Sequence, residues 1–261
     1  MIHLMDHPDA AAPPLHGGKF IPWDIFSARV WAARRSYDDG QFWVQNHPAL
    51  RAPLHGGECT AAISLVDGFA MLAAKESAGW EELLAFLQMQ PWVRLQCTDQ
   101  TAAKLPFPAE WTSVLMRFGA PKRVPLDPDP CPLTLAADVG EVYDMLVRCG
   151  FEGMRERLPW MADMALRWRR GTAQSWIAGG LSTASATALS QGYCFIGAVG
   201  TVPEARGRGL AGQLVARIAI QQRALGREIW LSCREERAGF YESVGFVRAG
   251  EMGTMRKEGT T

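Results

Sequence analysis

The sequence predicts a two-domain α/β (α+β) protein, with a smaller N-terminal α+β domain over residues 1–124 and a C-terminal domain over residues 132–261. The C-terminal sheet is expected to be mixed, mostly antiparallel and flanked by helices. Residues 124–132 hold four prolines, which remove backbone donors and favour extended conformations, so residues 125–131 are expected to be a linker. On both sides of it, short strand-like runs alternate with segments of helical period. The 261 residues, 48% of them hydrophobic, suffice for two cores.

The N-terminal domain is expected to mix helices and strands. Residues 22–35 have helix-like apolar spacing, and residues 80–89 repeat apolar positions at three and four residues. Residues 60–66 and 69–74 are short apolar runs joined by Asp67-Gly68, which predicts a hairpin. A further strand is expected over residues 92–97.

The C-terminal domain is expected to begin with helices and continue with strands. Residues 140–149 read as a helix, and residues 151–170 as helices interrupted near Pro159. Glycine-containing turns separate residues 174–177, 181–189 and 193–202, which predicts an antiparallel meander. A helix over 210–225, a strand over 228–233, a short helix stopped by Gly245 and a strand over 247–255 should follow. The sequence shows no internal repeat.

Charge and cysteine content narrow the classes of function. The formal net charge is zero, with 11 basic against 14 acidic residues in 1–130 and 16 against 13 in the remainder. This mild C-terminal excess suits a small anionic ligand, whereas nucleic-acid binding needs a stronger one. The six cysteines include no C-x-x-C pair, which indicates a reducing environment. We therefore expect a cytoplasmic protein, without nucleic-acid or membrane partners.

Residues 199–212 carry the strongest signal, because they lead from a strand into a helix through closely spaced glycines. Such a turn lets backbone amides converge at a helix N-terminus, a combination that favours a phosphate or pyrophosphate. Arg206 and Arg208 add positive charge. An exposed basic turn without a ligand is the structural alternative, and the turn by itself does not choose between them.

The same glycines also satisfy the dinucleotide fingerprint, as Gly207-x-Gly209-x-x-Gly212. In that fingerprint the first glycine directly follows its strand, but here residues 203–206 intervene. The preceding strands are also expected to be antiparallel. A nucleotide-binding oxidoreductase is therefore kept only as a less favoured alternative.

Two motifs resemble the GNAT (Gcn5-related N-acetyltransferase) superfamily. Arg206-x-x-Gly209-x-Ala211 resembles its [QR]-x-x-G-x-[GA] signature, and residues 240–246, F-Y-E-S-V-G-F, resemble its F-Y-E-x-x-G-F pattern. The resemblance covers roughly residues 133–255. It implies an N-acetyltransferase that moves an acetyl group from acetyl-CoA to a primary amine by direct attack, without a metal. The acceptor would be a small-molecule or peptide amine, and the protein a monomer or homodimer.

The resemblance also implies roles for particular residues, and a degenerate copy of the same fold in the N-terminal domain. Val199, Gly200, Thr201 and Val202 would pair with the pantetheine arm, and an amide near Val199 would polarise the thioester. The pyrophosphate would be held by Arg206, Gly207, Arg208, Gly209, Leu210, Ala211 and Gly212. Tyr241 would protonate the departing thiolate. Phe240 is expected beside the cofactor as a packing residue.

The sequence departs from the superfamily pattern at two places. Arg234 stands where many relatives have an asparagine near the pantetheine, and residues 193–198 lack the carboxylate that some relatives use as general base. The base could act through waters reached from Ser232, from a backbone carbonyl, or from a group of the N-terminal domain. A non-catalytic acyl-CoA sensor is therefore the main alternative.

The remaining candidates for chemistry, a cysteine, two histidines and several tryptophans, are mostly expected to have structural roles. Cys233 as a nucleophile would need a base, but all five histidines lie at or before position 55, so a buried thiol is expected. His3 and His7 have i, i+4 spacing, yet Pro8 follows and no third ligand is near, so no metal site is predicted. Tryptophans of the C-terminal domain are expected in the core or lining the acceptor site, among them Trp160, Trp168 and Trp176.

Overall fold

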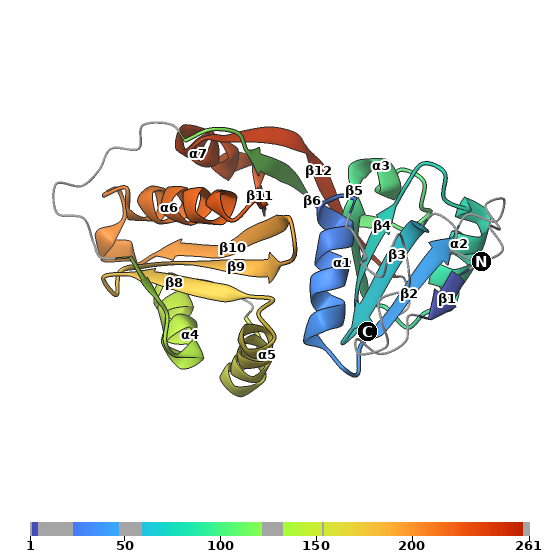
Figure 1. Ribbon diagram of the computed structural model, residues 1–261, viewed down its shortest axis with the longest axis horizontal. Helices are drawn as coiled ribbons and strands as arrows, with labels where there is room; N and C mark the ends of the chain where they lie inside the picture. The colour runs from blue at the N-terminus through green and yellow to red at the C-terminus, as the bar shows by residue number, and fades with distance from the viewer. Residues whose placement is uncertain (1, 5–22, 47–58, 122–132, 153, 258–261) are drawn as a thin grey trace. The chain divides into compact units, whose positions relative to one another are not determined.

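The computed structural model describes residues 2–4, 23–46, 59–121, 133–152 and 154–257 (Figure 1). The chain forms two compact units. Unit 1 comprises Met1–Ser113 with Gly250–Thr261, and unit 2 comprises Val114–Ala249. Their boundaries fall inside strands β6 (Ala109–Phe118) and β12 (Phe246–Arg256), so two strands run from one unit into the other. The expected linker over 125–131 lies outside the described residues.

Unit 1 is a sheet in the order β1-β2-β3-β4-β5-β12, with helices packed on it. Its neighbours are antiparallel except for the parallel pair of β4 and β5. The elements are β1 (Ile2–Leu4), α1 (Ile25–Ser36), β2 (Gln41–Asn46), β3 (Cys59–Val66), β4 (Phe69–Ala74), α2 (Trp80–Met89), β5 (Arg94–Thr98) and α3 (Asp99–Ala102).

Local chemistry explains the start and turn of several unit 1 elements. Asp24 caps α1, since its side chain accepts the Ser27 amide at 2.7 Å and the Ser27 hydroxyl accepts the Asp24 amide at 3.0 Å. Asp67 and Gly68 both have positive φ, 48° and 73°, as the predicted two-residue hairpin turn requires. Trp92 is fully buried and its indole N–H donates to the Leu87 carbonyl at 2.7 Å, which fastens α2 to the following strand.

Unit 2 is a sheet in the order β6-β11-β10-β9-β8-β7. The described pairs are antiparallel except for β10 and β11. Figure 1 shows α6 and α7 on one side of β8–β10, and α4 and α5 on the other. The elements are β7 (Leu133–Leu135), α4 (Val139–Arg148), α5 (Arg157–Arg169), β8 (Gln174–Ala178), β9 (Ser182–Leu189), β10 (Tyr193–Thr201), the 3₁₀ turn η1 (Pro203–Ala205), α6 (Leu210–Ala224), β11 (Glu228–Cys233) and α7 (Glu235–Val244).

The mixed, mostly antiparallel sheet flanked by helices is confirmed, and so is the β8–β9–β10 meander. Two expectations were wrong. Pro159 does not interrupt a helix, because it occupies the first turn of α5, where a missing N–H costs nothing. Residues 151–156 before it are not helical. Strands β2 and β6 were not predicted, since neither has the clean alternation that marks a half-buried strand.

The two units repeat one order of elements. Unit 1 has β2-β3-β4-α2-β5-α3 leading into β6, and unit 2 has β8-β9-β10-α6-β11-α7 leading into β12. In each, three antiparallel strands precede a helix and a parallel strand. The beginnings of α2 and α6 therefore occupy equivalent places in the two units, although the sequence shows no repeat.

Candidate active site

The site is built where β10 and β11 separate. Their parallel pairing covers Tyr193–Ile196 against Glu228–Leu231. Beyond it β10 continues to Thr201 and β11 to Cys233, and the described residues form no further pair between the two strands. The backbone edge of β10 from Gly197 onward thus turns away from its parallel neighbour while staying paired with β9.

A bulge follows directly after the separation. The register between β10 and β9 shifts between Gly197 and Gly200, and Ala198 adopts φ of 51°, a strained angle for a residue with a Cβ. Ser182 of β9 stabilises the end of the bulge, because its hydroxyl donates to the Gly200 carbonyl at 2.8 Å and lies 3.0 Å from the Thr201 hydroxyl. Strain that the surrounding bonds maintain is typical of a functional site.

Gly200 is required by a close approach. A Cβ at this position would lie 2.8 Å from Cys149 Cβ and 2.9 Å from Phe151 Cε2. The segment that follows α4 therefore packs directly on β10 beside the bulge. Cys149 is buried, and burial raises the pKa of its thiol, although the nearby Arg206 guanidinium lowers it.

The turn from β10 into α6 presents unpaired amides. Gly207 and Gly209 adopt φ of 80° and 76°, which only glycine takes without strain. The first intrahelical bond runs from the Gln213 amide to the Gly209 carbonyl at 3.0 Å. We find no acceptor among the described residues for five backbone amides, those of Gly207, Gly209, Leu210, Ala211 and Gly212. The positive end of the helix dipole adds to their field.

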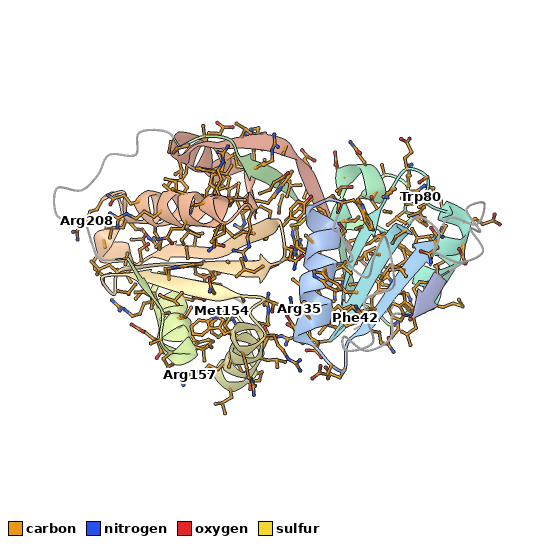
Figure 2. The ribbon with its side chains drawn as sticks, viewed as in Figure 1. Arg35, Phe42, Trp80, Met154, Arg157 and Arg208 are labelled. Carbon is orange, nitrogen blue, oxygen red and sulfur yellow. The ribbon has the colours of Figure 1, made fainter. Side chains whose placement is uncertain are left out.

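The two arginines of this turn differ in their surroundings. Arg206 donates from Nη2 to the Cys149 carbonyl at 2.9 Å and from Nε to the Thr201 carbonyl at 3.3 Å. Its guanidinium thus fastens the turn to the end of α4. Arg208 is exposed and lies beside the beginning of α6 (Figure 2). The motif specifies Arg206 and leaves position 208 open, and nothing in the sequence indicated that the two side chains lie in different surroundings.

Tyr241 lies on α7, where its ring packs against the core of unit 2 together with Val199 and Cys233. Burial raises the pKa of the phenol to about 12, and the neighbouring Cys233 thiol contributes in the same direction. The structure shows no hydrogen bond from the hydroxyl to the described residues, and the residue is only partly buried. It is therefore a protonated donor with an open hydrogen-bonding position.

Residues around Tyr241 are placed as follows. The Phe240 ring is 38% exposed and lies 4.9 Å from the Tyr241 ring, edge to face, so it supports that ring from outside the core. Arg234 is the N-cap of α7, and its side chain is 85% exposed. Cys233 is partly buried, its thiol lies 3.7 Å from the Met116 sulfur, and burial raises its pKa. This arrangement suits a structural thiol better than a nucleophile.

The three tryptophans singled out in the sequence differ in their burial. Trp176 is buried in the core, while Trp160 and Trp168 are partly buried beside α4 and the turn before α6. The Trp168 indole N–H is buried without a partner. No three His, Cys, Asp or Glu side chains in the described residues gather as metal ligands, and His7 lies outside those residues. None of the described helices is long and apolar enough to cross a membrane.

Residues 171–248 match the family described as an acetyltransferase (GNAT) domain. This part of the chain is a GNAT domain. It spans β8 to the beginning of β12 and so contains the separated strands, the bulge, the start of α6 and Tyr241. The resemblance that two short motifs suggested is thus confirmed. No curated protein matches the chain.

Solved GNAT structures share the fold of most or nearly all of the chain at low identity. A tandem GNAT protein from the clavulanic acid biosynthesis pathway has a TM-score of 0.54 and 14% identity, over 97% of this chain and 94% of that chain. A GNAT acetyltransferase from Colwellia psychrerythraea has a TM-score of 0.53 and 11% identity, over 98% and 100%. A GCN5-related N-acetyltransferase from Kribbella flavida has a TM-score of 0.52 and 14% identity, over 77% and 87%. These likenesses concern the fold alone.

The site contains residues that the sequence did not mark. Ser182 on β9 holds the bulge, Cys149 after α4 fills the space beside Gly200, and Arg167 on α5, paired with Asp163, donates to the Thr187 carbonyl of β9. None belongs to a motif. The i, i+4 spacing of Asp163 and Arg167 is the one signal that the sequence offered, and it is equally typical of a solvated helix face.

Proposed function

We propose that the GNAT domain transfers an acetyl group from acetyl-CoA to a primary amine by direct attack. The observation that carries the proposal is the course of β10, which leaves β11 after Ile196 and runs through a bulge into the unpaired amides at the beginning of α6. A thioester with a long amide-containing arm and a diphosphate has the chemistry that such a path can bind.

The free edge of β10 would hold the pantetheine arm. Backbone groups of residues 199–202 can pair with the amides of the arm as a neighbouring strand would. After Ile196 this edge of β10 is no longer paired with β11. An amide near Val199, beside the bulge, could therefore donate to the thioester carbonyl oxygen. That donation would stabilise the negative charge that develops when the amine attacks.

The start of α6 would hold the diphosphate. The amides of Gly207, Gly209, Leu210, Ala211 and Gly212 are unpaired within the described residues. They combine with the helix dipole to favour negative charge. Arg208 supplies a nearby cation, and Arg206 holds the turn in place through its two carbonyl bonds.

Tyr241 would act as the general acid. The neutral amine forms a C–N bond to the carbonyl carbon, the C–S bond breaks, and the phenol gives its proton to the departing thiolate sulfur. Because its pKa is raised to about 12, the phenol is protonated at neutral pH. Solvent then returns a proton to Tyr241, while the amine nitrogen loses one.

Calorimetry and a thiol-release assay test this function and its alternatives. We expect acetyl-CoA to bind and NADH not to bind, because the glycine turn follows an antiparallel meander and not the parallel strands of a dinucleotide-binding fold. Free thiol should then appear with members of a panel of primary amines, including small amines and short peptides. Acetyl-CoA binding without turnover across the panel would favour the sensor, and tight NADH binding would favour the oxidoreductase.

A further inference from the structure

Asp163 and Arg167 form an ion pair on α5 that faces the sheet of unit 2. Arg167 Nη1 lies 3.5 Å from Asp163 Oδ2, and the two side chains are only 21% and 26% exposed. The other α5 ion pair, Arg157 with Asp144 of α4, is more exposed and stands at the beginning of the helix (Figure 2). The Asp163–Arg167 pair is therefore a charged group of α5 that lies toward the sheet of unit 2.

This pair is fixed to a second bulge, on β9. Ala188 pairs with Phe195 and Ala186 pairs with Ile196, which leaves Thr187 as the extra residue of β9. Arg167 Nη2 donates to the Thr187 carbonyl, and the Thr187 hydroxyl donates to the Phe195 carbonyl at 3.3 Å. The ion pair is thus tied to the last residues of β10 that remain paired with β11.

Thr187 also reaches the strand position next to the β10 bulge. A Cβ at Gly197 would lie 3.2 Å from Thr187 Cγ2, so the threonine methyl fills the space of the missing side chain. Cys194 and Ile196 point into the core beneath α6. Because side chains alternate along a strand, Phe195 and Gly197 face the other side, where α5 lies. Arg167, and with it the Asp163 carboxylate 3.5 Å away, therefore lies on the side of the sheet that Phe195 and Gly197 face.

β10 itself offers no group for proton removal, because residues 193–201 contain no Asp, Glu or His. On α5 itself, the Arg167 guanidinium lies beside the Asp163 carboxylate. The β9 and β10 residues beside it, Thr187, Phe195 and Gly197, are not titratable at neutral pH. On this side of the sheet, α5 thus supplies a carboxylate that β10 does not have.

We propose that Asp163 is the general base that takes the proton from the acceptor amine, directly or through one water; this rests on the proposed acetyltransferase function. The carboxylate attracts the ammonium and accepts one N–H proton, which leaves the nitrogen lone pair free to form the C–N bond. The C–S bond then breaks, the thiolate takes the phenol proton of Tyr241, and Asp163 returns its proton to solvent. Arg167 acts as a positioning residue by fastening the pair to Thr187.

Two nucleophiles of different charge test the assignment. Ethylamine is an ammonium ion at neutral pH and needs a base, whereas hydroxylamine is largely uncharged and needs none. In Asp163→Asn, thiol release from acetyl-CoA with ethylamine should fall about 10²-fold or more, whereas release with hydroxylamine should change by less than about 3-fold. The Kd of acetyl-CoA should stay unchanged, and Asp163→Glu should restore part of the ethylamine rate.

Arg167→Met is the matched control, since it breaks the same ion pair but keeps the carboxylate. Because Arg167 acts only by positioning that carboxylate, the substitution should lower the ethylamine rate less than Asp163→Asn does and leave the hydroxylamine rate within about 3-fold of wild type. Equal losses with both amines in Asp163→Asn, or no loss with either, would overturn the base assignment, as would a wild-type protein that binds acetyl-CoA but releases thiol with neither amine. Failure of the wild-type protein to bind acetyl-CoA would instead refute the proposed function. If Asp163→Asn does not fold, an unchanged ratio of the two rates in Asp163→Glu overturns the assignment.

Discussion

Tyr241 shows how a single side chain is prepared for proton donation. Its ring packs against the unit 2 core, and burial raises the pKa of the phenol to about 12, so the hydroxyl stays protonated well above neutral pH. Tyr241→Phe removes only the hydroxyl. We expect kcat for thiol release to fall about 10²-fold, because the thiolate then departs without a positioned acid. The Kd of acetyl-CoA should remain unchanged.

Tyr143→Phe is the control for this measurement. It also removes one phenol hydroxyl, but that hydroxyl donates to the Arg155 carbonyl at 3.2 Å and has no assigned part in the reaction. An unchanged kcat in Tyr241→Phe at every pH would remove Tyr241 from the mechanism.

The raised pKa of Tyr241 also predicts a dependence of stability on pH. The folded phenol has a pKa of about 12, above the value of about 10 in an unfolded chain. The folded state therefore binds the proton more tightly, and this contribution to stability is complete below about pH 10 and is lost as the pH rises toward about 12. Between pH 8 and pH 11 the urea midpoint of the wild-type protein should fall more than that of Tyr241→Phe. Parallel losses would contradict the assignment of the shift to this residue.

At the scale of the element, the beginning of α6 depends on left-handed glycines. Gly207 has φ of 80° and no heavy atom within 4 Å of an added Cβ, so Gly207→Ala tests backbone angle without a clash. Gly226, with φ of 77° and equal open space, is its matched control after α6. Each substitution should cost roughly 1–2 kcal/mol of unfolding free energy. Only Gly207→Ala should weaken acetyl-CoA binding, by about 10-fold, which is ~1.4 kcal/mol.

Calorimetry and thermal melting of both variants give the two quantities. Equal acetyl-CoA affinity in Gly207→Ala and Gly226→Ala would mean that the turn before α6 does not hold the diphosphate.

At the scale of the whole molecule, the two units repeat their order of elements but differ in the residues at the beginnings of the equivalent helices α2 and α6. The first turn of α2, which corresponds to α6, carries Glu81 and Glu82. The amide of Gly79 donates to Gln45 Oε1 at 2.9 Å, so a protein side chain already satisfies it. Carboxylates at a helix N-terminus repel a phosphate. We therefore expect unit 1 to be a degenerate copy, and titration to give a single acetyl-CoA site per chain.

Charge reversal distinguishes the two helix beginnings. Arg208→Glu should weaken acetyl-CoA binding, while Lys75→Glu, before α2, should leave it unchanged. A second binding event lost in Lys75→Glu would show that unit 1 also binds the cofactor.

Strand β6 precedes residues 125–131 in the chain but pairs with β11 of unit 2. We therefore predict that a chain cut at residues 125–131 gives no stable C-terminal fragment. In unit 2, β11 pairs with Val114–Arg117 of β6, and Val114, Leu115, Met116 and Phe118 are buried. Burying each such side chain is worth roughly 1.5–3 kcal/mol, so their loss approaches the total stability of a typical domain, about 5–15 kcal/mol. Residues 132–261 alone should not unfold cooperatively. Adding residues 1–124 in trans should restore a cooperative transition, and a cooperative melt of 132–261 alone would contradict this.

The sequence by itself determined the meander, the strand that leads into α6, and the two motifs that carry the GNAT resemblance. These features are local: the side-chain period, glycine at positive φ and a turn within a few residues specify them. Only the tertiary structure decided that Arg206 holds the end of α4, that Arg167 reaches β9, and that β6 completes unit 2. Each of these joins residues that are far apart along the chain or on different elements. Hydrogen-bond register and packing between distant segments fix them, and no short stretch of sequence encodes either.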